Sequence, residues 1–535
     1  GTGIYFSLIT KFWQIRHFFD SFRFCFFPEK RGEMLSADKA KVTPYQAACV
    51  AIAGSIGSGN IGGVASAIAL GGPGVLFWMW MTALVGMMTK MVEVTLAVYY
   101  RKLDSDGRKT GGPLFYIERG LGSKFKFWGI FSLLFTVGIF MQLILAPEAY
   151  TVGESLHEVT GLRIIYLSAF FCLMCALVIW GGLRRVIGFA SFMMPLMSVL
   201  YIVFGAYIIL INITHIPAAI ALIVKSAFTP MAAVGGFAGA SFMLIARTGI
   251  ARGLFSNEAG WGTSPMVHAT ADQRHPIEQG MWGVMEVFID TIVICALTGL
   301  VLVSSGVWHE KYQNQFQGAD LVVLAGDYAE SDAADRAEVG AHLLGEKTLP
   351  LFSGDLRVER GEIETEGITI LHARSFAEAV QVKRDGQPFT GTLRVDQGKV
   401  LFPQAGDKAV YMEGRSLLHS APLSTEAFKR GILGDWGQYV IPVSLLLFAF
   451  STTIAWAYYG SRAITYLWGV RYVRYYQVIY VVAFFLASFT DTTIVWTLSG
   501  ITVALMTLPN LIGILLLHKE VKACVRDYVR KMKLG

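Results

Sequence analysis

The chain has 535 residues, of which 54% are hydrophobic and only 16% are charged, and its formal net charge is +6. Soluble proteins carry about 25% charged residues, so this composition excludes an ordinary soluble enzyme and favours a helical protein that crosses the lipid bilayer many times. The positive charge does not indicate a nucleic-acid partner, because the basic residues lie in short loops between apolar runs, where they set topology.

The first apolar segment covers residues 1–27 and is rich in aromatic side chains. No small-residue cleavage site follows it, so it is not typical of a signal peptide. Its first residues look like the middle of a helix. We therefore expect a partial, extra N-terminal transmembrane helix that begins before residue 1.

The second apolar segment, about 44–70, is long enough to cross a bilayer and unusually rich in glycine. Its central positions are Gly54, Gly57, Gly59, Asn60, Gly62 and Gly63. Glycine inside a helix costs about 1 kcal/mol relative to alanine. One interpretation is a helix broken at mid-membrane that lines a cavity, where freed N–H groups bind an anion and freed carbonyls bind a cation. The other is a glycine surface for close helix packing, and this stretch alone leaves both open.

The remaining apolar runs predict an all-α polytopic membrane protein. Residues 44–305 would hold core helices 1–7, residues 436–517 core helices 8–10, and residues 518–535 a basic tail. The run at 231–250 is interrupted by glycines near its start, like the run at 44–70. The further spans are predicted at about 75–100, 127–151, 163–182, 186–211, 231–250, 281–305, 438–461, 475–490 and 493–517.

Charge asymmetry between the loops predicts the orientation. Basic residues gather in the loops at 28–43 and 101–126 and in the tail, whereas the short loops on the other side hold little beyond Arg163 and Lys225. Because positively charged loops remain in the cytoplasm, the C-terminus is predicted to be cytoplasmic. The same alternation places residues 306–435 outside.

Residues 306–435 form a hydrophilic, acidic block inside one loop. Short alternating runs and turn signals such as Asp385-Gly386 and Gln397-Gly398 predict a small, mostly β, extracytoplasmic domain. It is either a spacer without a site or a ligand-binding domain.

Several ordered motifs resemble the alanine or glycine:cation symporter family, the sodium:alanine symporters. Only residues 306–435 fall outside this resemblance, as an insertion. The motifs are GNIGGVA at 59–65, ALGGPGVLFWMW at 69–80, ARGLFSNEAG at 251–260, FIDT at 288–291, FAFST at 448–452, YYG at 458–460 and LPNLI at 508–512.

The resemblance implies a leucine-transporter-type fold, in which two five-helix repeats are inverted and the first helix of each is broken at the substrate site. Residues 44–70 and 231–250 would be these two helices, and residues 1–27 an extra helix outside the core. The implied function is a secondary active symporter that imports a small neutral amino acid, alanine or glycine, with Na⁺ by alternating access. No other cofactor is implied. The implied location is the plasma membrane of a prokaryote, the inner membrane in a Gram-negative cell.

The resemblance also implies a sodium site between two helices. On the broken helix it would use the carbonyls of Ala53 and Ile56. On the eighth core helix it would use the carbonyl of Ala449 and the hydroxyls of Thr452 and Thr453. The alternative is that these hydroxyls only bond back to their own helix.

The substrate carboxylate would lie at the helix break, against N–H groups around Gly57, Ser58, Gly59 and Asn60.

Three further side chains are expected at the substrate. The resemblance places Gln142 in contact with it, and Phe237 and Trp456 could close a small apolar pocket, although aromatic residues in membrane helices are usually packing. The family usually has small and polar residues after this glutamine, whereas residues 143–148 read LILAPE, which bears on pocket size and substrate choice.

Charged residues inside the spans have two interpretations each. Lys90 and Glu93 could pair along one helix. Glu286 and Asp290 share a helix face, and a proton relay through them would make H⁺ the coupled ion. Gating or structural pairing is the other interpretation.

Ser256, Asn257 and Glu258 are expected to form an inner gate, with Arg252 as a partner of Glu258.

Three functions remain open: a sodium-coupled symporter, a proton-coupled symporter, and a membrane sensor that uses residues 306–435. No P-loop, nucleophile elbow or H-E-x-x-H motif supports an enzyme or a nucleotide-driven pump.

Overall fold

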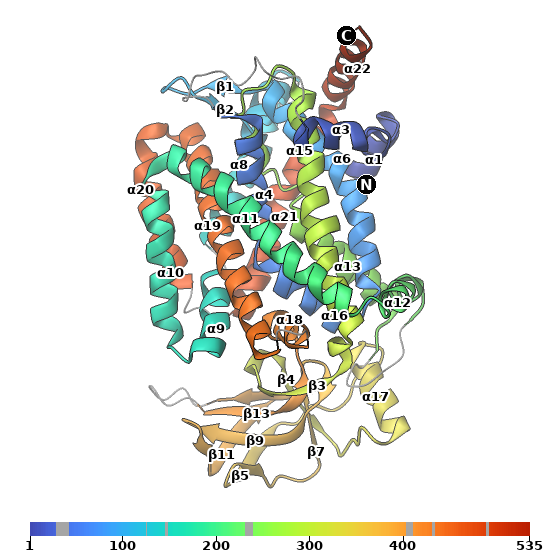
Figure 1. The fold of residues 1–535 in the computed structure, drawn as a ribbon. Helices are drawn as coiled ribbons and strands as arrows, with labels where there is room; N and C mark the ends of the chain where they lie inside the picture. Colours follow the sequence, from blue (N-terminus) through green and yellow to red (C-terminus); the bar gives the residue numbers. More distant parts are fainter. Residues whose placement is uncertain are drawn as a thin grey trace.

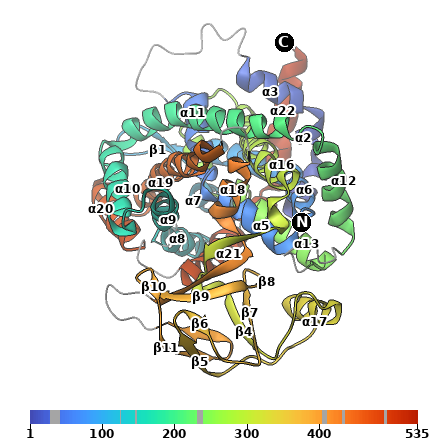
Figure 2. The same ribbon diagram turned by 60° about the horizontal axis from the view of Figure 1, so that its bottom comes forward.

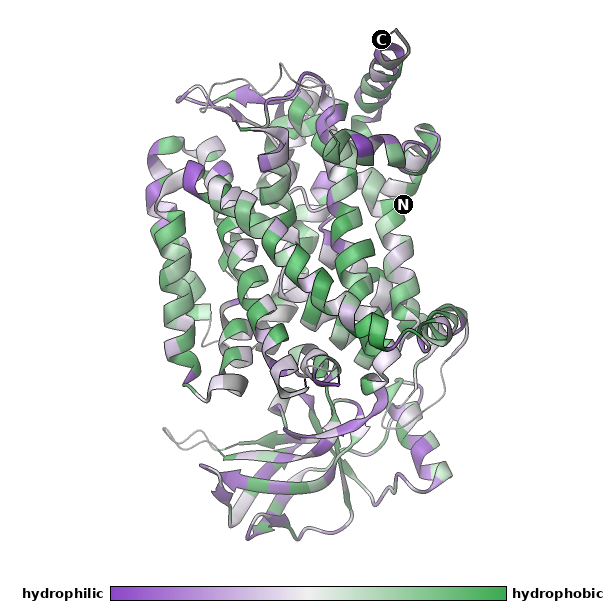
Figure 3. Cartoon of the chain, in the orientation of Figure 1, coloured by the Kyte–Doolittle hydropathy of each residue, from purple (hydrophilic) through white to green (hydrophobic). Residues whose placement is uncertain are grey.

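The computed structural model describes residues 1–27, 42–124, 126–144, 148–230, 239–402, 410–430, 434–487 and 492–534. A bundle of helices carries a β-rich domain at one end, and both chain termini lie toward the other end (Figure 1). Apolar residues dominate the bundle, and hydrophilic ones are frequent in the β-rich domain (Figure 3).

The helix predicted at 44–70 is broken. Thr43 and Gln46 form a reciprocal capping box at the start of α4 (Pro44–Ser55). After a short irregular stretch, the chain continues as the π-helical turn η1 (Gly59–Gly63) and as α5 (Val64–Gly71). The two halves are bent by 54°, as expected of a glycine-interrupted span rather than a continuous anchor.

The other bundle helices follow the predicted spans with three differences. The span predicted at 127–151 is divided into two helices, α12 was not predicted, and part of the span predicted at 231–250 lies outside the described residues. The helices are α6 (Val75–Tyr99), α8 (Trp128–Ile144), α9 (Glu148–Thr160), α10 (Ile164–Ile179), α11 (Gly182–Ile211), α12 (Ile216–Phe228), α13 (Phe242–Asn257), α15 (Pro276–Val287) with η3 (Phe288–Cys295) and α16 (Ala296–Ser305), α19 (Val440–Leu467), α20 (Val473–Ala487) and α21 (Thr492–Leu516).

Among the described residues, five helices are long and apolar enough to cross a membrane, or six if the bent pair is one span. Large apolar side chains face outward from the bundle, among them Leu133, Phe170 and Phe192, which are 62%, 58% and 67% exposed. Such a surface is stable in lipid and would aggregate in water. The chain is therefore a multi-pass membrane protein.

The first 27 residues differ from the predicted single helix. They form α1 (Thr2–Ile9), α2 (Trp13–Arg16) and α3 (Phe18–Phe26). Lys11 and Phe12 have positive φ angles of 57° and 55°, a backbone conformation that no continuous helix contains. α1 packs on α6, and α3 packs on α15. The tail predicted at 518–535 is also helical, as α22 (His518–Leu534).

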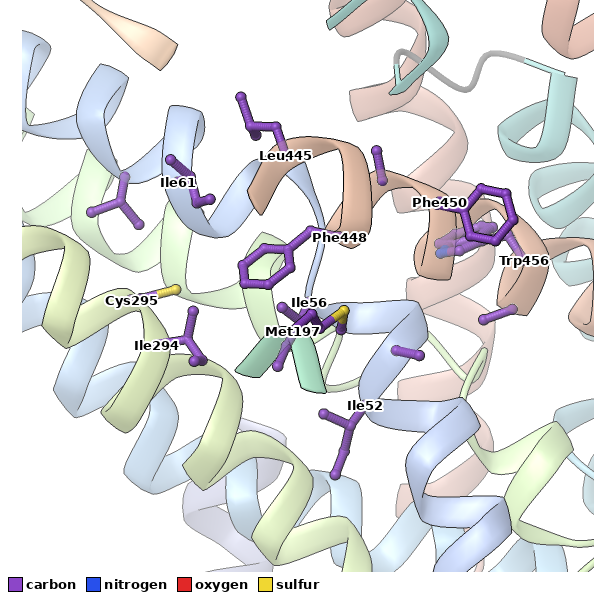
Figure 4. Packing of buried hydrophobic residues seen from close by; sticks show 14 of the residues in the cluster. Ile52, Ile56, Ile61, Met197, Ile294, Cys295, Leu445, Phe448, Phe450 and Trp456 are labelled. Carbon is purple, nitrogen blue, oxygen red and sulfur yellow. The ribbon is translucent and has the colours of Figure 1, made fainter. Parts of the chain in front are cut away.

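The centre of the bundle surrounds the broken helix. α4 packs against α11 and α19, α6 packs against α13 and α15, and α8 packs against α21. Figure 4 shows Ile52 and Ile56 of the first half of the broken helix close to Met197 of α11 and Phe448 of α19. Gly54 lies against the Tyr459 side chain, where a Cβ atom would collide with the ring hydroxyl.

The inserted domain contains three antiparallel sheets. Their strand orders are β10-β9-β13-β3, β12-β11-β5-β6 and β4-β7-β8. One additional helix, α17 (Ala333–Leu343), packs beside them. The strands are β3 (Lys311–Gln315), β4 (Leu321–Ala325), β5 (Gly354–Glu359), β6 (Glu362–Ile363), β7 (Ile368–His372), β8 (Ser375–Phe376), β9 (Glu378–Arg384), β10 (Gln387–Pro388), β11 (Gly391–Asp396), β12 (Lys399–Leu401) and β13 (Val410–Leu417).

Two strands of this domain are a short internal repeat that sequence analysis did not notice. β5 reads GDLRVE and β11 reads GTLRVD, and each is followed by a tight turn and a short return strand. The two copies pair antiparallel, with buried Leu356 opposite buried Leu393. The β12-β11-β5-β6 sheet is therefore nearly symmetric about this leucine pair.

A helix at the end of the insertion connects it to the bundle. α18 (Ser420–Lys429) contacts η1, α5, α16 and α19. Figures 1 and 2 show it at the end of the bundle that faces the β-rich domain. The Ser420 Oγ atom would lie 2.8 Å from a Cβ atom at Gly62, so α18 reaches the break in the first core helix.

We expect the inserted domain to lose stability in acid because of His372. This side chain is 2% exposed, accepts a hydrogen bond of 3.1 Å from the Gln317 N–H and lies 2.7 Å from Ser416 Oγ. Burial lowers its pKa to about 4. Since the unfolded pKa is about 6.5, the stabilisation is complete above that pH and is lost as the pH falls toward 4.

Hydrogen exchange of β7 and β13, corrected for its intrinsic pH dependence, should show weaker protection at about pH 5 than at about pH 7.5. In His372→Gln this difference should disappear, because glutamine does not titrate. Equal protection of the wild-type strands at both pH values would contradict the prediction.

Candidate functional site

A small cavity of about 50 Å³ lies at the break between α4 and η1. Most of its walls come from α4, η1, α8, α13 and α19. The lining residues are Gly54, Ser55, Gly57, Ser58, Gly59, Asn60, Gln142, Leu143, Glu148, Arg252, Phe255, Ser256, Glu258, Trp261, Thr452, Thr453, Trp456 and Tyr480.

The structure brings together three of the five groups expected to bind sodium. The Thr452 hydroxyl donates to the carbonyl of Ala53 at 3.2 Å and lies 3.0 Å from the carbonyl of Ile56. The other two groups contact each other, because the Thr453 hydroxyl donates to the Ala449 carbonyl at 2.8 Å. Thr453 thus shows the back-bonding that was the alternative interpretation, whereas Thr452 reaches across to the broken helix.

The same face of α19 contacts other carbonyls of α4. Trp456 Nε1 donates to the Gly54 carbonyl at 3.2 Å, and the Tyr459 hydroxyl lies 3.5 Å from the Ala51 carbonyl. The carbonyls from Ala53 on lack the partners that a continuous helix would supply, because the last helical hydrogen bond of α4 is accepted by Ile52. Side chains of α19 supply them here, which fixes the end of α4 against α19.

A second network holds the other side of the break. Asn60 Nδ2 donates to Asp290 Oδ1 at 2.6 Å and lies 3.1 Å from Ser256 Oγ. Asp290 Oδ2 also accepts from Ser256 Oγ at 2.6 Å and from Thr291 Oγ1 at 2.7 Å. This fully buried network joins η1, α13 and η3.

The predicted anion site at the break is partly occupied by the protein itself. The Gly57 N–H donates to Asn60 Oδ1 at 3.0 Å, and the Asn60 N–H donates to the Gly57 carbonyl at 3.1 Å. Gly57, Ser58, Gly59 and Asn60 all line the cavity. The N–H groups of Gly57 and Asn60 already have partners within the protein.

The three expected substrate contacts have different outcomes. Gln142 lines the cavity, but its Nε2 lies 2.9 Å from Ser499 Oγ and its Oε1 accepts from Thr502, so its amide is satisfied within the protein. Trp456 lines the cavity and meets Trp261 edge to face, with ring centroids 6.2 Å apart. Phe237 lies outside the described residues.

The inner-gate prediction needs one correction. Arg252 and Glu258 both line the cavity, but they form no ion pair in the part of the chain that the structure describes. Glu258 Oε2 instead accepts from Thr263 Oγ1 at 2.5 Å. Glu258 ends α13 in the left-handed conformation, with φ of 52°, which turns its side chain out of the helical pattern. Asn257 contacts Thr291 at 3.2 Å, next to Asp290.

The predicted pairing of Lys90 with Glu93 is also replaced by contacts between helices. Lys90 Nζ lies 3.2 Å from Glu286 Oε1, and Glu286 Oε2 lies 3.0 Å from His268 Nε2. Glu93 accepts from Asn510 of α21 and from the Gly260 N–H at 2.9 Å. These buried charges bind α6, α15 and α21 to the chain after α13. Their partners could not be chosen from spacing along one helix.

Sequence reasoning missed several lining residues, of which Glu148 is the most informative. It begins α9 and lines the cavity, directly after the division of the predicted 127–151 span. The signal was visible in the sequence as a carboxylate and a proline inside an apolar run. Phe255 and Trp261 also line the cavity, with ring centroids 5.0 Å apart.

Comparisons with known proteins identify the family and the fold. A sequence profile described as the sodium:alanine symporter family matches residues 1–331 and 406–535. Residues 332–405, most of the β-rich insertion, lie outside that match.

Two of the relatives are sodium symporters with different named amino acids. The sodium/alanine symporter AgcS of Methanococcus maripaludis is 29% identical, over 97% of this chain and 90% of that protein. The probable sodium/glutamine symporter GlnT of Bacillus subtilis is 37% identical, over 57% of this chain and 62% of that protein.

The crystal structure of MhsT in complex with L-phenylalanine matches with a TM-score of 0.51 and 10% identity, covering 89% of this chain and 88% of that one. At this identity the likeness shows the fold alone, a helical bundle of the leucine-transporter type.

We expect Asp290→Asn to destabilise the protein. Its carboxylate accepts hydrogen bonds from three side chains, and an amide would turn an N–H toward at least one of those donors. The free energy of unfolding should fall by about 1–3 kcal/mol. Thermal unfolding in one detergent would measure this against wild type.

The matched control is Asp527→Asn, because Asp527 is 51% exposed and its ion pairs with described residues are those with His275 and Lys531. It should leave the melting temperature nearly unchanged. If the melting temperature of Asp290→Asn were no lower than that of this control, the Asp290 network would not be what stabilises the break.

Proposed function

The chain belongs to the sodium:alanine symporter family, and from this premise we propose that it imports a small neutral amino acid, such as alanine or glycine, together with Na⁺ by alternating access. Its family makes it a membrane transporter rather than an enzyme. The proposal concerns the ion, the substrate and the residues that bind them.

The observation that carries the proposal is the contact of Thr452 with two carbonyls of the broken helix. A cation that leaves water at mid-membrane needs several oxygen ligands in place of its hydration shell. The carbonyls of Ala53 and Ile56 are already directed at one hydroxyl oxygen. When the Thr452 proton rotates away, that oxygen becomes a third ligand, and Thr453 and Ala449 lie one residue and one turn away on α19.

Such a site couples ion and substrate because both depend on the same break. The carbonyls lie at the end of α4, and Gly57 to Asn60 follow immediately along the chain. An ion that draws α4 and α19 together also shapes the cavity that the substrate enters. This shared element gives Na⁺ binding a direct effect on amino-acid binding.

We extend the proposal to topology. α4 to α5 and the region that ends in α13 would be the broken first helices of two inverted five-helix repeats. The β-rich domain would lie outside, and α22 with the basic loops in the cytoplasm of a prokaryotic cell. The distribution of Lys and Arg supports this orientation.

A proton-coupled mechanism is the alternative for the ion. It is favoured by the buried carboxylates of Glu286 and Asp290, one turn apart and connected to His268 and Asn60 respectively. A sensor function would use the inserted domain, where a separate hollow is lined by residues of β6, β7 and β9. It has less support, because the family match is to transporters and most of this domain lies outside the match.

The deciding experiment is uptake of labelled alanine into liposomes that contain the purified protein. It should be run with a Na⁺ gradient, with a pH gradient and with neither, and repeated with glycine and glutamine. We expect accumulation only with the Na⁺ gradient. Accumulation driven by the pH gradient alone would replace Na⁺ by H⁺, and no uptake of any of the three would overturn the proposed substrate class.

We expect Thr452→Ala to raise the Na⁺ concentration for half-maximal uptake by about 10- to 100-fold, because one ligand oxygen is lost. The protein should still fold, since only one hydroxyl and one methyl group are removed from a packed helix. Uptake as a function of Na⁺ concentration measures the effect.

Thr465→Ala is the control for this change. Thr465 lies on the same helix, and its hydroxyl donates only to the Ser461 carbonyl, at 2.8 Å. Its Na⁺ dependence should equal that of wild type. Unchanged Na⁺ activation in Thr452→Ala would remove the sodium site from this position.

A further inference from the structure

Arg252 is the one cation in the cavity wall, and it forms no ion pair with any residue that the structure describes. Arg252 projects from α13, and its Nε and Nη2 atoms are buried without a hydrogen bond to any described residue. Its guanidinium lies over the Phe255 ring, 5.2 Å from the centroid. A buried, unpaired charge is costly, and proteins tolerate it mainly where an opposite charge binds.

The broken helix is built to admit this side chain. The guanidinium lies against Gly59 and Gly63 of η1, where any Cβ atom would collide with it. These glycines therefore serve a second purpose besides the break. They leave room for a planar cation beside the backbone that lines the cavity.

Two of the protein's own carboxylates near Arg252, those of Asp290 and Glu258, accept hydrogen bonds from other side chains. Asp290 accepts from three side chains, and Glu258 accepts from Thr263. The backbone donors of Gly57 and Asn60 are also used. Arg252 is thus the strongest donor in the cavity wall that still lacks an acceptor.

We propose that the Arg252 guanidinium binds the α-carboxylate of the transported amino acid. This inference rests on the proposed function and names the group that anchors the substrate in the same cavity. A guanidinium can donate two parallel hydrogen bonds to a carboxylate, a stronger and more directional contact than single backbone N–H groups give.

The other charges of the cavity define the substrate class. Glu148 enters from α9, on a different side of the bundle from α13 (Figures 1 and 2). Glu258 is the third charged lining residue, so the wall has two carboxylates for one guanidinium. A zwitterion fits this arrangement, with its ammonium near a carboxylate. A second carboxylate on the substrate would meet like charge, so acidic amino acids are excluded.

The test compares alanine with alaninamide, in which a neutral amide replaces the carboxylate, as ligands of purified protein in Na⁺. The readouts are the rise in melting temperature and competition against labelled alanine uptake. Wild type should bind alanine about 100-fold more tightly than alaninamide. Aspartate should compete neither with alanine nor with alaninamide.

In Arg252→Gln, alanine affinity should fall about 10- to 100-fold, while alaninamide affinity changes by less than about threefold. Without ligand this variant should melt no lower than wild type, because it removes a charge that has no partner. A lower ligand-free melting temperature would assign Arg252 a structural role and overturn the proposal. Arg252→Lys keeps the charge without the fork and should give intermediate affinity.

Arg247→Gln is the matched control, because Arg247 lies on the same helix with an exposed side chain. It should bind alanine like wild type. If Arg252→Gln still prefers alanine to alaninamide as strongly as wild type, the assignment of Arg252 is wrong while the proposed function stands. If wild type neither takes up nor is stabilised by any neutral amino acid, the proposed function itself fails.

Discussion

A helix that breaks inside a membrane releases backbone carbonyls that lipid cannot solvate, and the organisation of this protein follows from that constraint. The released carbonyls at the end of α4 are met by one face of α19, through Thr452 and Trp456. Each of these side chains can rotate away from the carbonyl that it contacts. In the proposed sodium site, the carbonyls that Thr452 now satisfies would then become ligands of the cation.

The chain after the break, in η1, is held by different groups from those that hold the end of α4. There the central group is the carboxylate of Asp290, which accepts from Asn60 and from the hydroxyls of Ser256 and Thr291. Lys90 and Glu286 extend the polar contacts toward the far end of α13. The two halves of the broken helix are therefore bound to different helices, α19 on one side and η3 on the other. Relative motion of those helices would open or close the cavity between them, which is the geometry that alternating access needs.

The sequence predicted features that depend on local pattern and missed those that depend on which helices become neighbours. Glycine spacing identified the break, and apolar length identified most spans. Lys90 and Glu93 are adjacent on one helix face, yet each finds a better partner on another helix, so spacing within α6 suggested the wrong pair. Averaged hydropathy predicted one span at 127–151, whereas the described residues there form α8 up to Ile144 and α9 from Glu148. Whether Arg252 has a partner depends on which side chains other elements place around α13. No single segment of the sequence contains that information.

The inserted domain is joined to this mechanism by one helix. The family profile resumes at residue 406, so α18 belongs to the shared part of the chain, whereas β5 to β11 do not. α18 lies against η1 at Gly62, two residues from Asn60. Any change in the break must therefore be accommodated by α18, and through it by β13, which precedes α18 in the chain. A domain inserted at this position is attached to α18, which already contacts the transporter core. Its size can therefore change without disturbing the site, as long as α18 keeps its position.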